Sequence, residues 1–304
     1  MEMIQFERLV PERKAEYDQY LMTCGQRGCE YSFVNLYLWG RQTAAIVEDY
    51  LVIFSHFNGH SVYPFPVGRG DIRPVLDAII EDSRERGIPC RFTSLNQADI
   101  ELLEAFYPGK FRFRCDRSDF DYVYHIDDLA DLKGRKYQQK RNHVNRFQAN
   151  FPDWHAEMLD ETTMEDAKAL IGHWFSHKEE EPEMDMGLEK VALRRAFEHF
   201  EDLGLEGLVL YAGGQPVAVT MGSRLSQDTF DVHFEKARED IQGAYGAINR
   251  AFARHLREKY PDLRYLNRED DLGLPGLRKA KLSYEPAFLV EKCWAYLAEE
   301  AYDD

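Results

Sequence analysis

Alternating polar residues on one short segment could supply a general base. Residues 231–236 read Asp-Val-His-Phe-Glu-Lys, and the two-residue alternation of a strand places Asp231, His233 and Glu235 on one face. If that face lines a cleft, His233 or Glu235 is positioned to take a proton from an acceptor amine or hydroxyl. The alternative is an edge strand whose polar face is in contact with water.

A second group of polar residues follows another predicted strand, Arg264–Asn267. The chain there enters a loop with Gly273 and Gly276, and glycines permit close approach of the backbone to a ligand. Basic side chains beside them can hold a phosphate or a carboxylate. An ordinary surface loop is the alternative. The candidate ligands are Asn267, Glu269, Asp270, Arg278, Lys279 and Lys281.

A basic segment interrupts an acidic chain. The protein has a formal net charge of -16, yet Lys133 to Arg146 holds six basic residues and no acidic one. On a helix, Tyr137, Val144, Phe147 and Phe151 form an apolar stripe, and Lys140 projects within it. Such a lysine either extends to solvent along its stem or meets an anion in a pocket. The candidate phosphate ligands of this segment are Lys136, Lys140, Arg141 and Asn142.

A glycine-containing turn opens a predicted helix over Gly243–Tyr260. A helix N-terminus is a natural anion site because its first backbone N–H groups lack partners within the helix. The candidates at this turn are Gly243, Tyr245 and Gly246.

The elements that position these residues alternate irregularly between strands and helices, which predicts an α+β protein. For the first half we expect helices at 10–23, 71–86 and 97–106 and strands at 43–47, 51–57, 62–66 and 90–95. For the second half we expect helices at 164–177, 188–203 and 243–260 and strands at 155–159, 208–211, 216–224, 229–236, 264–267 and within 287–297. The acidic loop at 178–185 could act as a lid.

Length and composition limit the possible classes of protein. A chain of 304 residues with 44% hydrophobic residues predicts two globular domains. The excess of 54 acidic over 38 basic residues argues against broad, non-specific nucleic-acid binding, although a local basic site remains compatible with it. No stretch approaches the roughly 20 apolar residues of a membrane span. The five cysteines are scattered, which predicts reduced thiols in a cytoplasmic protein, with neither zinc nor disulfides.

Four ordered blocks of sequence carry a family resemblance. They are Gly-Arg-Lys-Tyr-x-x-Lys-Arg-Asn-x-x-Asn-Arg-Phe at 134–147, His-Phe-Glu-Lys-Ala at 233–237, Gly-Ala-Tyr-Gly-Ala-Ile-Asn at 243–249, and Asn-Arg-Glu-Asp-Asp-Leu-Gly-x-x-Gly-Leu-Arg-Lys-Ala-Lys-Leu-Ser-Tyr at 267–284. Together they resemble the phosphatidylglycerol lysyltransferase C-terminal-domain family, which is similar to the Fem-type aminoacyltransferases. The resemblance covers most of the chain and is strongest after Lys133.

This resemblance implies two GNAT-like domains in tandem, each a mixed, mostly antiparallel sheet flanked by helices. We expect an N-terminal GNAT-like domain at residues 1–126 and a C-terminal one, carrying the active site, at 127–304. Related enzymes transfer an aminoacyl group from charged tRNA to an amine or hydroxyl. Lipid-modifying relatives often carry a membrane-spanning region that this sequence does not contain, so the acceptor stays open between a small molecule, a peptide and a lipid headgroup.

The leading hypothesis is therefore aminoacyl transfer from tRNA, with no metal required. Glu235 or His233 would deprotonate the acceptor, Tyr284 would protonate the leaving group, and amides at 243–246 would polarise the donor carbonyl. Lys136, Lys140, Arg141, Arg278 and Lys279 would hold phosphates. The alternatives are an acyl-CoA-dependent N-acyltransferase, which the misspaced glycines at 242–246 weaken, and a non-catalytic binding protein on an acyltransferase scaffold.

Overall fold

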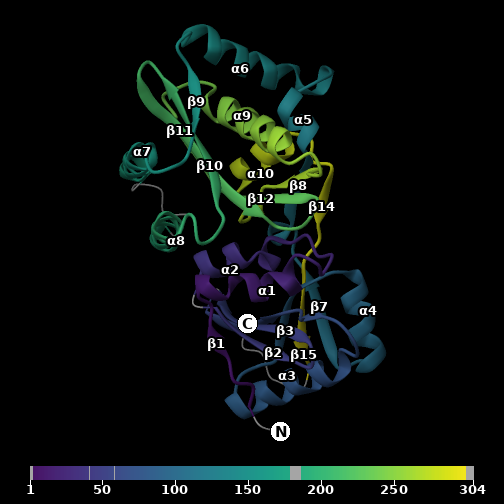
Figure 1. The fold of residues 1–304 in the computed structure, drawn as a ribbon. Helices are drawn as coiled ribbons and strands as arrows, with labels where there is room; N and C mark the ends of the chain where they lie inside the picture. Colours follow the sequence, from purple (N-terminus) through teal and green to yellow (C-terminus); the bar gives the residue numbers. More distant parts are fainter. Residues whose placement is uncertain (1–2, 41, 58, 179–185, 299–304) are drawn as a thin grey trace. The chain divides into compact units, whose positions relative to one another are not determined.

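The computed structural model describes residues 3–40, 42–57, 59–178 and 186–298. The chain forms two compact units, each built on its own sheet (Figure 1). The first unit runs to Asp121 and also includes Asp270–Gly273 and the chain from Val290 onward. The second unit comprises Tyr122–Glu269 and Leu274–Leu289. The loop at 178–185, expected to act as a lid, lies outside the described residues from position 179.

The first unit contains an eight-stranded sheet with the order β1-β2-β3-β4-β6-β15-β7, in which β5 also pairs with β3. Strands β4 and β6 run parallel, and the other pairs are antiparallel. The strands are β1 (Glu7–Arg8), β2 (Thr43–Val47), β3 (Tyr50–Phe57), β4 (His60–Pro64), β5 (Val67–Gly68), β6 (Arg91–Leu95), β7 (Phe111–Cys115) and β15 (Cys293–Leu297). The helices are α1 (Lys14–Leu21), α2 (Phe33–Leu38), α3 (Arg73–Arg86) and α4 (Gln97–Phe106).

A disulfide joins two strands of the first unit. Cys115 of β7 lies directly opposite Cys293 of β15, and their sulfur atoms are bonded across a sequence separation of 178 residues. The prediction that all cysteines are reduced thiols is therefore wrong for this pair. Spacing in the sequence gave no sign of it, because the two strands become neighbours only through the return of the chain to the first sheet.

We expect reduction of this disulfide to lower the free energy of unfolding by about 2–4 kcal/mol, because the link restricts a long loop in the unfolded chain. Urea unfolding with and without dithiothreitol measures the difference. Cys115→Ser should reproduce the reduced value and then be insensitive to dithiothreitol. An equal midpoint for oxidised and reduced protein would contradict the prediction.

The second unit contains a seven-stranded sheet with the order β14-β8-β13-β12-β11-β10-β9. Strands β12 and β13 run parallel and are connected by helix α9, so α9 begins beside the C-terminal end of β12. The strands are β8 (Asp121–His125), β9 (His155–Met158), β10 (Glu206–Ala212), β11 (Gln215–Arg224), β12 (Thr229–Ala237), β13 (Tyr265–Asn267) and β14 (Phe288–Val290). The helices are α5 (Ile126–Asp131), α6 (Gln138–Asn150), α7 (Met164–Lys178), α8 (Met186–Glu198), α9 (Ala244–Lys259) and α10 (Pro275–Leu282).

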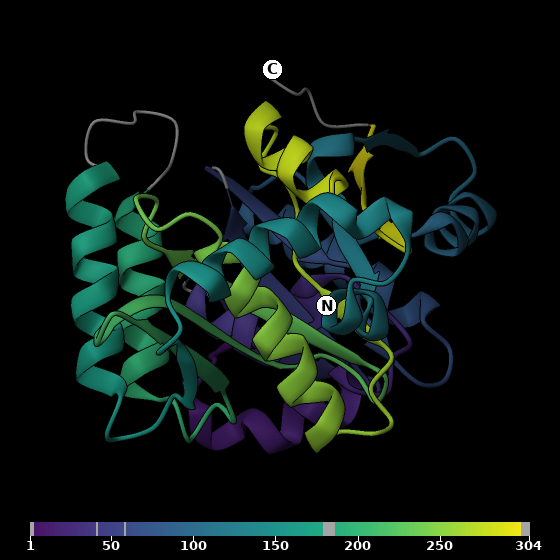
Figure 2. The same ribbon diagram turned by 90° about the horizontal axis from the view of Figure 1, so that it is seen from above.

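Helices cover both faces of this second sheet. Helix α9 packs its apolar side onto one face, where Phe252 meets Phe230 of β12 edge-on at 5.8 Å between ring centroids. Helices α7 and α8 lie side by side on the other face (Figures 1 and 2). Helix α6 lies across the start of α9 (Figure 2) and buries Val144 and Phe147 of the predicted stripe. The α+β prediction of two mixed sheets flanked by helices is confirmed.

The expected division at residues 126 and 127 differs from these units in three places: residues 122–126 belong to the second unit, and residues 270–273 and the chain from Val290 onward belong to the first. Strand β8 belongs to the second sheet, where it pairs with β13, and residues 122–124 are completely buried. Strand β15 returns to the first sheet, where it lies between β6 and β7. In the described part of the chain, every helix is too short or too polar to cross a bilayer.

Candidate functional site

A β-bulge in β12 decides which polar residues face one another. Met221 of β11 pairs with Phe234, but the next residue, Gly222, pairs with Val232, so His233 is an extra residue on β12. A bulge reverses the alternation of side chains beyond it. The predicted common face of Asp231, His233 and Glu235 is therefore wrong.

Contacts on the two sides of the bulge confirm the reversal. Glu235 accepts a hydrogen bond from Asn249 of α9, at 3.1 Å from Nδ2 to Oε2. Its neighbour Lys236 points the other way, with Nζ 3.7 Å from the ring centroid of Trp174 on α7. His233 bonds to Ser223, whose strand partner is Asp231. Glu235 thus lies on the α9 face, and His233 lies on the α7 face.

On the α9 face, Glu235 forms an ion pair with Arg268, which directly follows β13. The Nη2–Oε1 distance is 2.9 Å, and only 16% of the Arg268 side chain and 9% of the Glu235 side chain are exposed. Two buried atoms beside this pair, Arg268 Nη1 and Asn249 Oδ1, have no hydrogen-bond partner among the described residues. A buried donor and a buried acceptor left open at one place indicate a site for a polar ligand.

Tyr284 and Lys140 complete this group, which we call the α9-face cluster: Lys140, Glu235, Asn249, Arg268 and Tyr284. The guanidinium carbon of Arg268 lies 5.2 Å from the ring centroid of Tyr284, and Lys140 Nζ lies 4.0 Å from it. Burial, reinforced by the charge of Glu235, raises the pKa of Tyr284 to about 12. Burial, followed by the charge of Arg268, lowers the pKa of Lys140.

The half-buried Lys140 has no carboxylate partner in the parts of the chain that the structure describes. Its cationic neighbour is Arg268. Lys140 and Arg268 both lie on the Tyr284 ring, and the single carboxylate of Glu235 pairs with Arg268. This excess of positive charge favours binding of an anionic ligand.

The first turn of α9 borders the cluster. A Cβ atom on Gly246 would lie 3.6 Å from the Tyr284 hydroxyl and 3.3 Å from Val144 of α6, so these groups flank the turn. Gly243 has φ +89°, and a Cβ there would lie 2.7 Å from the carbonyl oxygen of His143. Helix α6 therefore covers one side of the helix start. The side chain of Tyr245 on the same turn is exposed.

The other predicted cations have structural partners or face solvent. Arg141 donates to the carbonyl oxygens of Leu132 and Gly134, in the connection that follows α5. Lys281 Nζ donates to the carbonyl oxygens of Arg268 and Glu269, at 2.6 and 3.1 Å. Three further predicted residues lie outside the cluster: Lys136, which pairs with Asp128 at 3.4 Å, and the exposed Asn142 and Lys279. Arg278 is partly buried on α10.

The predicted loop residues shape the backbone that carries Arg268. Asn267 is buried and accepts a hydrogen bond from the backbone N–H of Glu269, at 2.7 Å. Glu269 has the left-handed φ of 56°, and its side chain turns to His233 on the α7 face. Asp270 belongs to the first unit, where it accepts from the N–H of Leu272 at 3.0 Å.

Sequence reasoning missed two members of the cluster. Arg268 and Asn249 stood in the quoted motifs but were not among the predicted ligands. A signal existed for Arg268, since an arginine at the end of a predicted strand commonly needs an acidic partner. Asn249 is one turn beyond Gly246 on α9, and only the bulge brings Glu235 within its reach.

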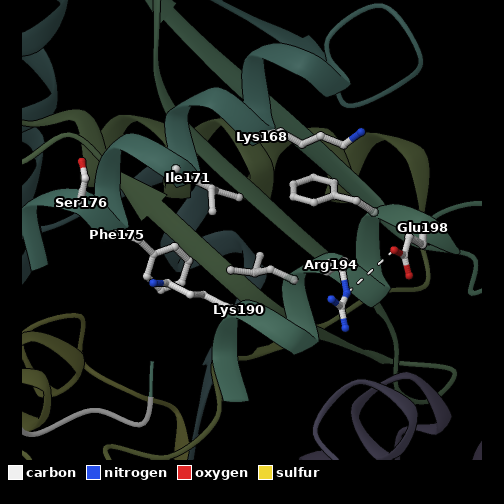
Figure 3. A pocket seen from close by; sticks show the side chains of 10 residues that line it. Lys168, Ile171, Phe175, Ser176, Lys190, Arg194 and Glu198 are labelled. Carbon is white, nitrogen blue, oxygen red and sulfur yellow. Dashed lines mark ion pairs between the residues drawn. The ribbon is translucent and has the colours of Figure 1, made fainter. Parts of the chain in front are cut away.

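A groove of about 570 Å³ lies away from the cluster, between α7 and α8 (Figure 3). None of the predicted site residues lines it. Its walls combine apolar side chains with Lys168, Lys190 and an Arg194–Glu198 pair at 3.9 Å. The α9-face cluster is the better candidate for the functional site, because its acidic, basic and hydroxyl groups converge on one place.

One family model matches most of the chain, and solved structures share its fold. The family described as "Phosphatidylglycerol lysyltransferase, C-terminal" matches residues 22–296. A crystal structure of a conserved protein of unknown function from Bacteroides thetaiotaomicron is 37% identical, covers 97% of this chain and 100% of that chain, and gives a TM-score of 0.92. The structure of L-PGS from Bacillus licheniformis is 16% identical, covers 97% and 94%, and gives a TM-score of 0.68.

Two further comparisons concern the fold and the length. A tandem GNAT protein from the clavulanic acid biosynthesis pathway is 12% identical, covers 99% and 100%, and gives a TM-score of 0.51. An uncharacterized protein of Mycoplasmoides gallisepticum is 24% identical over 177 residues, which are 58% of this chain. The match spans only 55% of that relative's length. The tandem GNAT-like fold expected from the sequence is confirmed.

Proposed function

This chain belongs to the phosphatidylglycerol lysyltransferase C-terminal family, and on that premise we propose that it transfers an aminoacyl group from tRNA to an amine or hydroxyl. The observation that supports this proposal most directly is the α9-face cluster. It brings a partly buried tyrosine, two cations and a carboxylate to the first turn of one helix. The tRNA donor assigns the reaction to the cytoplasm.

Each polar group of the cluster has a role in such a transfer. The acceptor nitrogen or oxygen attacks the ester carbonyl of the donor, and the Glu235 carboxylate takes the proton it loses. The bond between the carbonyl carbon and the ribose oxygen breaks, and the Tyr284 hydroxyl gives that oxygen its proton. With its pKa raised to about 12, the Tyr284 hydroxyl is protonated at neutral pH, as an ordinary tyrosine also is, and it can therefore act as the acid.

The remaining groups bind the donor and stabilise charge. Arg268 Nη1 and Lys140 Nζ are the open donors for an anionic oxygen, either the developing oxyanion or a phosphate. Arg135 and Arg146 add positive charge on the exposed side of the α6 segment, with no acidic partner among the described residues. His233 takes no part in this scheme, because it lies on the opposite face of the sheet.

Donor binding tests the proposal. Filter binding should detect aminoacyl-tRNA at low salt and show weaker retention at high salt, since phosphate contacts release counterions. Thermal shift with coenzyme A and an acyl-CoA panel provides the competing test, because a ligand that binds the folded state raises the melting temperature. A shift with acyl-CoA and no retention of charged or uncharged tRNA would overturn the tRNA donor. If wild type transfers no aminoacyl group and Glu235→Gln still binds the donor, the protein is a binding protein and not an enzyme.

Replacing Lys140 by alanine should weaken binding of the anionic donor about 10–100-fold, because a charged hydrogen bond is lost. The affinity of wild type should be full below the pKa of Lys140 and should fall as pH rises through it. Since that pKa is lowered, the fall begins at a lower pH than for an ordinary lysine. Binding curves across pH measure this. Lys279→Ala, an exposed lysine on α10, is the control and should leave affinity and pH dependence unchanged.

Replacing Tyr284 by phenylalanine should lower the transfer rate about 100-fold or more at unchanged stability, because the ring remains and only the acid is lost. Single-turnover kinetics with saturating donor separates this from weaker binding. Tyr211→Phe, on β10 and outside the α9-face cluster, is the matched control. Equal rates for Tyr284→Phe and wild type would exclude Tyr284 as the acid.

A further inference from the structure

The α7 face of the bulge holds a second group of polar residues that the proposed transfer does not use. The geometry points to a binding site for a divalent transition-metal ion, formed by Asp231, His233 and Glu269. One ligand atom from each residue lies within 4.8 Å of the other two. All three residues belong to the second unit: Asp231 and His233 lie within β12, and Glu269 follows the neighbouring strand β13.

The distances fit metal ligands better than hydrogen bonds. His233 Nδ1 lies 3.4 Å from Glu269 Oε1 and 3.5 Å from Asp231 Oδ2. Both distances exceed the usual range for an N–H···O bond, about 2.7–3.2 Å. A tetrahedral ion with bonds of about 2.0–2.2 Å separates neighbouring ligand atoms by about 3.3–3.6 Å. His233 Nδ1 therefore lies at ligand spacing from each of the two carboxylate oxygens, which lie within 4.8 Å of each other.

Ser223 supports the imidazole from behind. Its hydroxyl lies 2.8 Å from His233 Nε2, which is a normal hydrogen-bond distance. If Nε2 carries the proton and donates it to Ser223, Nδ1 keeps its lone pair and points it at the two carboxylates. Histidine ligands are commonly oriented in this way by a hydrogen bond to the other ring nitrogen. The bulge, which adds His233 to β12, makes this orientation possible.

The ligand set indicates which ions fit. One imidazole and two carboxylates suit zinc or manganese, and three protein ligands leave a position for water or a substrate atom. Asp231 and His233 have no exposed side-chain surface, whereas 20% of the Glu269 side chain is exposed, which gives the ion a path of entry. The ion would fix Glu269 and thereby the adjacent Arg268 of the α9-face cluster.

The first unit contains another group of residues of the types that bind metal ions, but a cation of the protein already lies among them. Cys29, Glu30 and Asp121 of the first unit also lie close together. There, however, the Lys292 ammonium already occupies the centre, with Nζ 2.6 Å from Glu30 and 2.8 Å from Asp121. The ammonium group therefore accounts for the closeness of these two carboxylates in the first unit.

Untagged full-length protein, stripped with chelator and dialysed against micromolar zinc or manganese, tests this site. We expect one ion per chain by elemental analysis and a rise in melting temperature on adding the ion back. Glu269→Gln keeps the size and polarity of the side chain and should lower affinity about 100-fold or more. Ser223→Ala should lower it about 10–100-fold at unchanged stoichiometry.

His199→Gln is the matched control, since this histidine lies after α8 and outside the proposed site. It should bind like wild type. Wild type that retains no ion would overturn the proposal, and so would folded Glu269→Gln protein that binds as tightly as wild type. Tetrahedral cobalt absorption that appears in wild type and is lost in His233→Gln gives a second readout that does not depend on stability.

Discussion

Arg268→Ala should lower the free energy of unfolding by about 3–5 kcal/mol and abolish transfer. The substitution leaves the Glu235 carboxylate, only 9% exposed, without its cationic partner, and breaking a buried ion pair costs this much. It also removes a guanidinium that lies 5.7 Å from the Tyr124 ring centroid and 5.2 Å from that of Tyr284. Urea unfolding and single-turnover transfer measure the two effects.

A surface pair of the same chemistry provides the control. Arg238 and Asp240 pair at 2.6 Å, but their side chains are 30% and 60% exposed, so Arg238→Ala should change stability by less than about 1 kcal/mol. The double variant Arg268→Ala with Glu235→Gln should recover part of the lost stability, because the unpaired charge is gone. If Arg268→Ala costs no more than Arg238→Ala, the pair is not buried in solution.

Several elements could be predicted because their signals are local. Helix α4 matches its predicted range, and its N-cap Asn96 forms a capping box with Asp99. The β10–β11 hairpin turns at Gly213 and Gly214, both with positive φ. Strand β8 was missed because it depends on tertiary contacts: its buried acid, Asp121, is satisfied by the backbone N–H of Cys29 and by Lys292.

The site could be predicted only in part, and the cations show why. Their charge was visible in the sequence, but the partners that decide their roles were not. Arg141 and Lys281 donate hydrogen bonds to backbone carbonyl oxygens, which turns of the chain bring close to them. Lys140 is the cation that the sequence placed within the apolar stripe, and in the structure it packs on the ring of Tyr284. Residue type thus indicated where positive charge gathers in the sequence, but not which of the cations have structural partners.

Gly222→Ala should destabilise the protein by about 3 kcal/mol or more, the upper end of the cost of overpacking. A Cβ atom at this position would lie 2.1 Å from the carbonyl oxygen of Asp231 and 2.8 Å from the ring of Phe230. The close obstacle is backbone, so no side-chain rotation relieves it, and β11 and β12 must separate. The measurement is the free energy of unfolding in urea.

The same substitution tests whether the bulge organises both faces of the sheet. Separating β11 from β12 should weaken the Ser223–His233 contact on one face and displace Glu235 from Arg268 on the other, so transfer should fall even in protein that remains folded. Gly172→Ala, in the middle of α7 with open space around it, is the control and should stabilise by about 0.5–1 kcal/mol. A Gly222→Ala protein with wild-type stability and activity would show that β12 reaches the same arrangement without this close approach. The separation of Glu235 from His233 would then need a cause other than the bulge.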